Sequence, residues 1–230
     1  MSWDEGFAHR YEEWSAHMTE DVPFYVELAR AAHGSLVELA VGNGRVAIPV
    51  AQATGKTVLG IDTSPSMLEH ARTRAVEAGV TLDLREGDMR DLSLDEPAAL
   101  IYCPFRALLH LPTWADRRRT FERVSASLAP GGRFAWNAFA FDHNIAARLD
   151  GHHQDAPVPH SLSYDVPENR VDIVLDETGG TSSIWWATKN EWLGLVDVAG
   201  LEVEALYGGF GGEPLSPASR EYVFVTRARL

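Results

Sequence analysis

The residues best suited to chemistry follow the ends of predicted strands. Gly42-Asn43-Gly44 comes directly after the apolar run at residues 35–40 and before a predicted helix. Glycine lets the backbone turn sharply and approach a ligand closely, and the following helix would point its N-terminus at that ligand. A tight turn with no ligand is the alternative, because any doubly wound fold can contain Gly-x-Gly. On its own, the loop is weak support for a nucleotide-like ligand.

Asp62 and the acidic loop at residues 86–91 narrow the choice of ligand. Asp62 ends the second predicted strand, where its carboxylate can accept hydrogen bonds from both hydroxyls of a ribose. Asp88 can accept a hydrogen bond from the exocyclic amine of adenine, and the backbone of Met89 can pair with the ring. A helix-capping aspartate and a solvated acidic loop are the competing interpretations. In this order, the three loops predict a nucleoside-bearing cofactor at the carboxyl ends of the strands.

The elements that would position these loops alternate between strand and helix. Strands are expected at residues 35–40, 57–62, 81–85, 98–103, 133–140, 201–207 and 221–227. Helices are expected at residues 45–54, 65–78, 113–128 and 190–199. Such alternation implies right-handed crossovers and predicts an α/β fold with a doubly wound, mostly parallel sheet.

Two segments depart from this alternation. Phe7, Tyr11, Trp14 and Met18 recur at the three- and four-residue spacing of an amphipathic helix. Alternating apolar residues and turn signals after the fifth strand predict a small antiparallel β insertion. The predicted organisation is one domain over residues 1–230, with a helical lid at 1–34, a ligand-binding core at 35–150, the insertion at 151–189 and a closing helix and strands at 190–230.

Composition excludes several classes of partner. The formal net charge is −13, and the densest basic run, at residues 117–119, lies on a predicted helix, so we expect no nucleic-acid partner. No apolar stretch is long enough to span a bilayer, and the start of the chain lacks the pattern of a secretion signal. The single cysteine cannot form an internal disulfide. We therefore expect a cytoplasmic protein without a membrane partner, and a homodimer is left open.

Four ordered motifs resemble those of the class I S-adenosylmethionine (AdoMet)-dependent methyltransferases of the small-molecule type. They are Glu38-Leu-Ala-Val-Gly-Asn-Gly-Arg45, Gly60-Ile-Asp-Thr-Ser-Pro-Ser-Met-Leu68, Glu86-Gly-Asp-Met-Arg-Asp-Leu92 and Leu128-Ala-Pro-Gly-Gly-Arg-Phe134. The resemblance covers residues 35–140 and implies a Rossmann-like, seven-stranded sheet whose last strand is antiparallel. It also implies AdoMet as the cofactor and methyl transfer to a nitrogen or oxygen of a small molecule.

The resemblance further implies which residues surround the cofactor. The implied set is Glu38, Gly42, Asn43 and Gly44 at the methionine portion, Asp62 at the ribose, Asp88 and Met89 at the adenine, Tyr11 near the sulfonium, and Thr63, Met67 and Cys103 elsewhere around the ligand. Ala40 and Asn43 depart from the family pattern, which has glycine at the first position and a small Cys, Ser or Thr at the second. Ala40 fits this loop if its φ is negative.

Transfer of a sulfonium methyl group is an in-line displacement. The protein must align donor and acceptor, exclude water and remove a proton where the acceptor requires it. His110, which follows the fourth strand, is the first candidate base, and His143, just past the fifth strand, is the second. Because the chain has nine histidines, a surface or packing role is the alternative for each.

The sequence says less about the small molecule that accepts the methyl group. Arg106, Trp185 and Tyr207 are candidate acceptor-binding residues: Arg106 would hold an anionic acceptor, and core packing is the alternative for the two aromatic residues. No metal is expected, because the histidines at 152, 153 and 160 lack the helical spacing of a zinc pair. Two rival functions remain open: an AdoMet-binding protein with other chemistry or a regulatory role, and a nicotinamide-dependent dehydrogenase. The dehydrogenase would share the first turn and Asp62 but would not explain the loop at residues 86–91.

Overall fold

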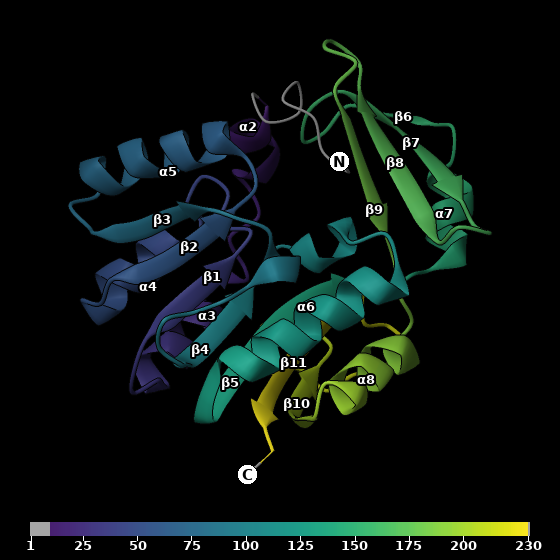
Figure 1. Cartoon of the computed structure of the whole chain (residues 1–230). Helices are drawn as coiled ribbons and strands as arrows, with labels where there is room; N and C mark the ends of the chain where they lie inside the picture. Colours follow the sequence, from purple (N-terminus) through teal and green to yellow (C-terminus); the bar gives the residue numbers. More distant parts are fainter. Residues whose placement is uncertain (1–9, 230) are drawn as a thin grey trace.

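The computed structural model describes residues 10–229, which form two β-sheets and the helices around them (Figure 1). The larger sheet has the strand order β10-β11-β5-β4-β1-β2-β3. Its strands are β1 (Leu36–Leu39), β2 (Val58–Asp62), β3 (Leu82–Glu86), β4 (Ala98–Cys103), β5 (Leu128–Phe139), β10 (Leu201–Tyr207) and β11 (Glu221–Ala228). Strands β1 to β5 pair in parallel, whereas β11 runs antiparallel to both β5 and β10. The predicted α/β sheet with an antiparallel last strand is therefore confirmed.

Helices cover both faces of this sheet (Figure 1). They are α3 (Val22–Ala31), α4 (Ala47–Thr54) and α5 (Pro65–Glu77) on one face, and α6 (Trp114–Ser127) and α8 (Lys189–Val198) on the other. Neighbouring residues of β4 point to opposite faces: Leu100 packs with the first group of helices and Ile101 with the second. Burial on both faces explains why the central strand β4 is continuously apolar.

The second sheet is antiparallel and has the order β6-β7-β8-β9. Its strands are β6 (His153–Gln154), β7 (His160–Asp165), β8 (Arg170–Leu175) and β9 (Thr181–Trp185). It follows α7 (His143–Leu149) and stands beyond the carboxyl ends of the main strands (Figure 1). The short helix α2 (Tyr11–Ser15) packs against it, because the rings of Trp14 and His160 lie 4.8 Å apart. The predicted antiparallel insertion is present, with β6 as an additional strand.

Two local differences from the sequence-based expectations are found. Helix α2 ends at Ser15, so Met18 lies beyond it, and Phe7 lies outside the described residues. Strand β5 begins at Leu128 rather than after the Pro-Gly-Gly turn, because residues 129–132 are accommodated by a register shift against β4. Such a bulge admits extra residues without ending the strand.

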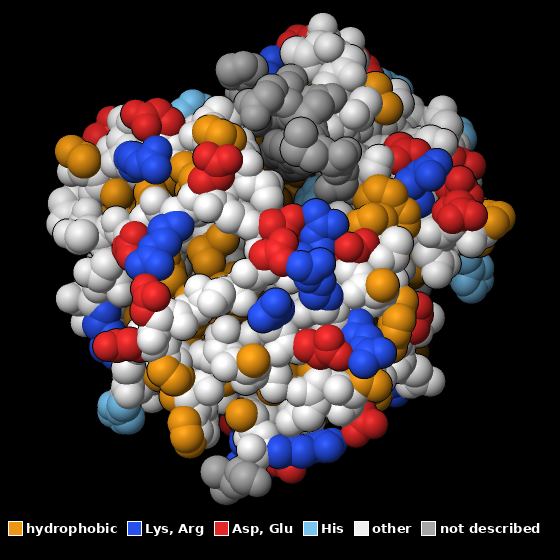
Figure 2. All heavy atoms as spheres, in the orientation of Figure 1, with side chains coloured by type: hydrophobic (Ala, Val, Ile, Leu, Met, Phe, Trp, Pro, Cys, Tyr) orange, Lys and Arg blue, Asp and Glu red, His pale blue; other side chains and the backbone are white. Residues whose placement is uncertain are grey.

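Neither a metal site nor a membrane span is found in the described part of the chain. No group of three or more His, Cys, Asp or Glu side chains within residues 10–229 is arranged to hold a metal ion. In the same residues, no helix is both long and apolar enough to cross a lipid bilayer. On the face shown in Figure 2, acidic and basic side chains are intermixed.

Candidate active site

A cleft of about 1390 Å³ opens at the carboxyl ends of the main parallel strands. One side is formed by residues at the ends of the strands, including Asp62, Asp88 and Asn137. The other side is formed by α2 and the antiparallel sheet, through Trp14 and Ile184 among others. Ligand pockets for a single drug-sized molecule typically measure 300–1,000 Å³. The cleft therefore has room for a cofactor and a second small molecule.

The structure brings most of the predicted site residues to this cleft. Those that line it are Tyr11, Asp62, Thr63, Met67, Asp88, Met89, Arg106, His110 and Trp185. Glu38, Gly42, Asn43, Gly44 and Cys103 lie at or next to the end of a strand behind this wall. His143 is exposed at the start of α7, and Tyr207 packs against Phe24 with 6.4 Å between ring centroids. Neither residue lines the cleft, so the geometry gives no support to their predicted roles.

The loop after β1 contains three residues with positive φ. Gly42 and Gly44 have φ of 53° and 78°, and Ala40 has φ of 54°. The condition that φ at Ala40 be negative is therefore not met. A left-handed conformation costs an L-residue about 1–2 kcal/mol. The chain adopts it because it must leave β1 while Val41 donates a backbone hydrogen bond to Ile61, at 3.0 Å. Backbone strain of this kind is concentrated at functional sites.

Asp62 is fixed by the backbone at the end of β2. Its Oδ2 accepts a hydrogen bond from the Gly42 amide at 2.8 Å, and its Oδ1 accepts one from the Ser64 amide at 2.9 Å. Burial raises the pKa of Asp62, and these backbone hydrogen bonds oppose that rise. The Thr63 amide also bonds to this carboxylate. Since a carboxylate has about four lone-pair sites, the remaining site can accept from a ribose hydroxyl. Asp62 also ties the glycine loop to β2.

Two buried oxygens beside the glycine loop have no hydrogen-bond partner within residues 10–229: Glu38 Oε2 and Asn43 Oδ1. The two residues are 1% and 3% exposed. Burial raises the pKa of Glu38 well above its usual value. An unpaired buried acceptor is costly, so such atoms call for a donor. The ammonium group of the methionine portion of AdoMet would supply one, and these residues therefore fit the predicted cofactor.

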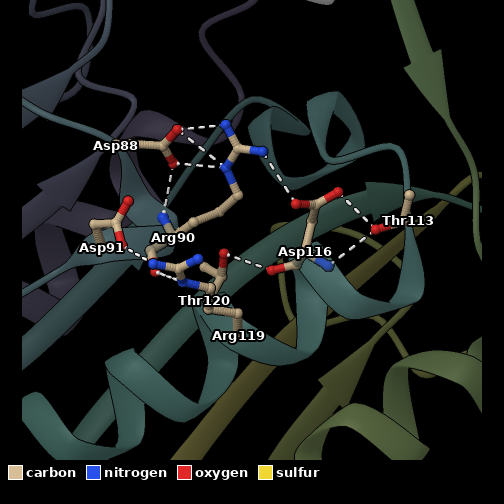
Figure 3. A network of polar contacts seen from close by, with 7 residues as sticks. All are labelled: Asp88, Arg90, Asp91, Thr113, Asp116, Arg119 and Thr120. Atoms are coloured by element: carbon tan, nitrogen blue, oxygen red, sulfur yellow. Dashed lines mark hydrogen bonds and ion pairs between the residues drawn. The ribbon is translucent and has the colours of Figure 1, made fainter.

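Arg90 holds Asp88 at the predicted adenine end of the cleft (Figure 3). Arg90 Nε lies 3.0 Å from both carboxylate oxygens of Asp88, and its Nη1 lies 3.0 Å from Asp116 on α6. Thr113 caps α6 and also bonds to Asp116. Hydrogen bonding by Arg90 lowers the pKa of Asp88, so this carboxylate is ionised at neutral pH. Arg90 orients the acceptor predicted for adenine, and the sequence analysis did not identify it.

Arg45 is a second residue that the sequence analysis missed. It forms a bidentate ion pair with Asp21, with distances of 2.7 and 2.6 Å, and the two side chains are 10% and 5% exposed. Its guanidinium also lies 4.5 Å from the ring centroid of Phe105, in the loop after β4. Tyr11 contacts the same ring edge-on at 5.9 Å. Arg45 thus joins the segment from Tyr11 to Asp21 to the loop that follows β4.

Burial keeps two cleft residues in their neutral forms. It raises the pKa of Tyr11 to about 12, with Arg45 acting in the opposite direction. It lowers the pKa of His110 to about 4, against a smaller opposing effect from the backbone of Ser183. His110 ends the 3₁₀ helix η2 (Ala107–His110) that follows the loop after β4. It is therefore uncharged at neutral pH and able to accept a proton.

Cys103 lies fully buried at the end of β4. Burial raises the pKa of its thiol well above the usual value, so the thiolate is not formed at neutral pH. Because the thiolate is the nucleophilic form, Cys103 is inert as a nucleophile. Its place on the strand agrees with a packing role beside the cleft.

Comparison with known proteins identifies relatives along the whole chain. The methyltransferase-domain family profile matches residues 36–132. The dTDP-4-amino-2,3,4,6-tetradeoxy-D-glucose N,N-dimethyltransferase of Saccharopolyspora spinosa is 27% identical over 221 residues, which cover 90% of this chain and 86% of that relative. Other curated relatives are matched over 39 to 52% of their own length.

Solved structures share the fold over nearly the full chain. The CcbJ methyltransferase from Streptomyces caelestis gives a TM-score of 0.81 at 23% identity, covering 97% of this chain and 96% of that one. CalS10, an amino pentose methyltransferase from Micromonospora echinaspora solved with AdoMet, gives 0.66 at 22% identity, covering 99% and 98%. These matches confirm the predicted fold. The methyltransferase-domain profile and the N,N-dimethyltransferase relative agree with the predicted cofactor and activity. The predicted enzyme class is thereby confirmed: residues 36–132 match the methyltransferase-domain family, and most of the chain is similar to a small-molecule N,N-dimethyltransferase.

Proposed function

We propose that this enzyme methylates the amino nitrogen of a sugar carried on a nucleoside diphosphate. The observation that carries the proposal is the size of the cleft, which extends past the cofactor residues to a second polar wall at Asn137, Arg220 and Glu221. A curated relative that matches 90% of the chain is named as an N,N-dimethyltransferase of a dTDP-linked amino sugar. A structural neighbour is likewise named as an amino pentose methyltransferase.

The proposed roles of the residues follow from their positions. AdoMet, when bound, supplies an electrophilic methyl group that its own positive charge activates. Glu38 and Asn43 hold the methionine portion, Asp62 holds the ribose, and Asp88 with Met89 holds the adenine. Tyr11 and the ring of Phe105 close the cleft around the reacting atoms and exclude water. His110 accepts the proton that the acceptor nitrogen must lose.

The N-terminal segment and the antiparallel insertion form the lid in this proposal. Support comes from Trp14 and Ile184, which line the cleft from those two parts of the chain. We also propose that residues 10–229 act as one domain and that the enzyme works in the cytoplasm, where a free cysteine such as Cys103 stays reduced. The homodimer stays a prediction, which sedimentation of the purified protein would test.

Transfer from labelled AdoMet to dTDP-4-amino-2,3,4,6-tetradeoxy-D-glucose tests the proposed acceptor class. We expect the label to enter this amine and not the matching 4-hydroxy sugar, because a neutral amine is the stronger nucleophile. Calorimetric titrations with AdoMet and with NADH test the cofactor in parallel. Binding of AdoMet without transfer to any amine in a panel of amino sugars would contradict the proposed function. That outcome would favour the regulatory or non-methylating alternative.

Replacing His110 with alanine should slow turnover by about 10²-fold or more, because the positioned base is lost. The affinity for AdoMet should change by less than about twofold. As a matched control, His70→Ala removes an exposed histidine on α5 and should leave both quantities unchanged. A turnover number unaffected by His110→Ala would remove His110 as the base.

The same variant gives a pH-dependent prediction for stability. The pKa of His110 is about 4 in the folded protein and about 6.5 when unfolded, so the unfolded state binds more protons between these values. The free energy of unfolding should therefore fall as the pH drops from 6.5 towards 4. The His110→Ala variant lacks this contribution. Urea unfolding at pH 7.5 and pH 5 should show a larger loss for the wild type, by ~1–2 kcal/mol.

A further inference from the structure

A polar network that the sequence analysis did not predict lies on the cleft wall opposite the cofactor loop. Three of its four members come from segments of the main sheet: Arg106 follows β4, Asn137 is near the end of β5, and Glu221 begins β11. All three line the cleft. Asn137 is 3% exposed, and the side chain of Glu221 is 14% exposed. The fourth member, Tyr25 on α3, is fully buried behind them.

Hydrogen bonds fix the orientation of the Asn137 and Glu221 side chains. Asn137 Oδ1 accepts from the Tyr25 hydroxyl at 3.2 Å and from the Arg106 amide at 3.3 Å, while its Nδ2 donates to Glu221 Oε2 at 3.2 Å. Glu221 Oε1 accepts from Arg106 Nε at 2.7 Å and also from its Nη2. Within residues 10–229, one N–H of Asn137 and one lone pair of Glu221 Oε2 therefore remain for a ligand.

The network contains two opposite charges, on Arg106 and Glu221. The guanidinium of Arg106 compensates the carboxylate of Glu221, so the pair presents an acceptor oxygen without a net negative charge. This pairing also changes the expectation for Arg106, whose charge is not available for an anionic acceptor. Tyr25 on α3 is itself titratable, and Asp21, Cys103 and Glu38 act on it from nearby. His110 on η2 and Arg220, which lies 3.5 Å from Asp142, line the same cleft, and Asp21 is paired with Arg45.

Fully hydrogen-bonded buried networks fix one arrangement of side chains, and they are costly if any member lacks a partner. Here the network stands in a cleft wall, with a donor and an acceptor left over side by side. A neutral amine on a sugar fits this combination, because its N–H donates to the carboxylate oxygen and an oxygen of the sugar can accept from the Asn137 N–H. An apolar acceptor would leave both groups unpaired.

We propose that Glu221 and Asn137 form the subsite that binds the reacting amine, with Arg106 as a positioning residue. This inference rests on the proposed function. Glu221 Oε2 accepts a hydrogen bond from the amine N–H and leaves the nitrogen lone pair directed at the methyl carbon. As the N–C bond forms and the C–S electron pair passes to sulfur, the nitrogen gains positive charge, which the carboxylate stabilises. The N–H proton then passes to His110.

The subsite also explains how the site avoids holding the acceptor as an unreactive ammonium ion. An isolated carboxylate would stabilise the protonated amine, which has no lone pair for attack. Compensation by Arg106 reduces this effect while keeping the hydrogen bond. The pH dependence of turnover with the amine is therefore set by the balance between Glu221 and Arg106.

Two variants test the subsite with dTDP-4-amino-2,3,4,6-tetradeoxy-D-glucose as the probe. Glu221→Gln should lower kcat/KM for the amine by about 10- to 100-fold, because a charge-assisted hydrogen bond is lost. It should shift the acidic limb of the pH profile of kcat to lower pH. Arg106→Gln should shift that limb to higher pH, because the uncompensated carboxylate favours the ammonium form. The AdoMet dissociation constant should stay within about twofold in both variants.

A matched control separates the subsite from general effects on stability. Glu204→Gln breaks a Glu–Arg pair on the neighbouring strand β10, where Glu204 bonds to Arg133 outside the cleft, and should change none of these quantities. If the wild type methylates the amine but both variants keep its kcat/KM and pH profile, the subsite is wrong and the proposed function stands. If the wild type methylates no amine, the proposed function and the subsite fail together.

Discussion

Replacing Asp62 with alanine should weaken AdoMet binding by ~1–3 kcal/mol, a rise in Kd of about 5- to 150-fold. Two effects contribute to this loss. The charge-assisted hydrogen bonds to the ribose disappear, and the Gly42 amide loses the carboxylate oxygen that holds it at 2.8 Å. Isothermal titration calorimetry with AdoMet measures the change directly.

The two contributions can be separated with a second substitution. Asp62→Asn keeps one side-chain oxygen that can accept from the Gly42 or Ser64 amide but removes the charge, so we expect a Kd between those of the wild type and Asp62→Ala. Asp83→Ala, which removes an exposed aspartate on the neighbouring strand β3, serves as the control and should bind AdoMet normally. An unchanged affinity in Asp62→Ala would rule out the ribose assignment.

The strands and cofactor loops could be predicted because they depend on local patterns. Asp62 lies at the carboxyl end of β2, beside the loop that follows β1, since the carboxyl ends of parallel strands meet at one edge of the sheet. Ser64 illustrates the same point for helices: a serine directly before a proline is the common pattern of a helix N-cap, and the Ser64 hydroxyl accepts from the Met67 amide at 3.3 Å. Such features need only a few neighbouring residues to be specified.

The acceptor side could not be predicted because its contacts join distant parts of the chain. Arg106 and Glu221 are 115 positions apart, and no local pattern connects them. Arg106 was selected as a cation for an anionic acceptor, whereas its charge is compensated within the protein. The conformation of Ala40 could not be predicted for a different reason. Its positive φ follows from the hydrogen bonds of neighbouring residues, and an alanine in the sequence gives no sign of it. The acceptor wall thus required the tertiary structure.

Replacing Arg45 with methionine should lower the free energy of unfolding by ~3–5 kcal/mol, because it leaves the carboxylate of Asp21 buried without its cation. It should also weaken AdoMet binding, because Arg45 joins the segment that carries Tyr11 to the loop that carries Phe105. Urea unfolding and calorimetry measure the two effects separately. A loss of stability with unchanged AdoMet affinity would show that the segment closes the site without Arg45.

Two comparisons identify the buried charge as the cause. Arg30→Met breaks an exposed pair with Glu27 on α3, and exposed pairs contribute ~0–1 kcal/mol, so this control should remain near wild-type stability. Adding Asp21→Asn to Arg45→Met removes the unpaired charge and should restore much of the lost stability, because replacing both members of a buried pair is far less damaging than removing one. In one outcome, the double variant regains stability while its affinity for AdoMet stays low. That result would separate two roles of Arg45: its charge neutralises Asp21 and stabilises the fold, whereas its side chain joins the N-terminal segment to the loop after β4 and supports cofactor binding.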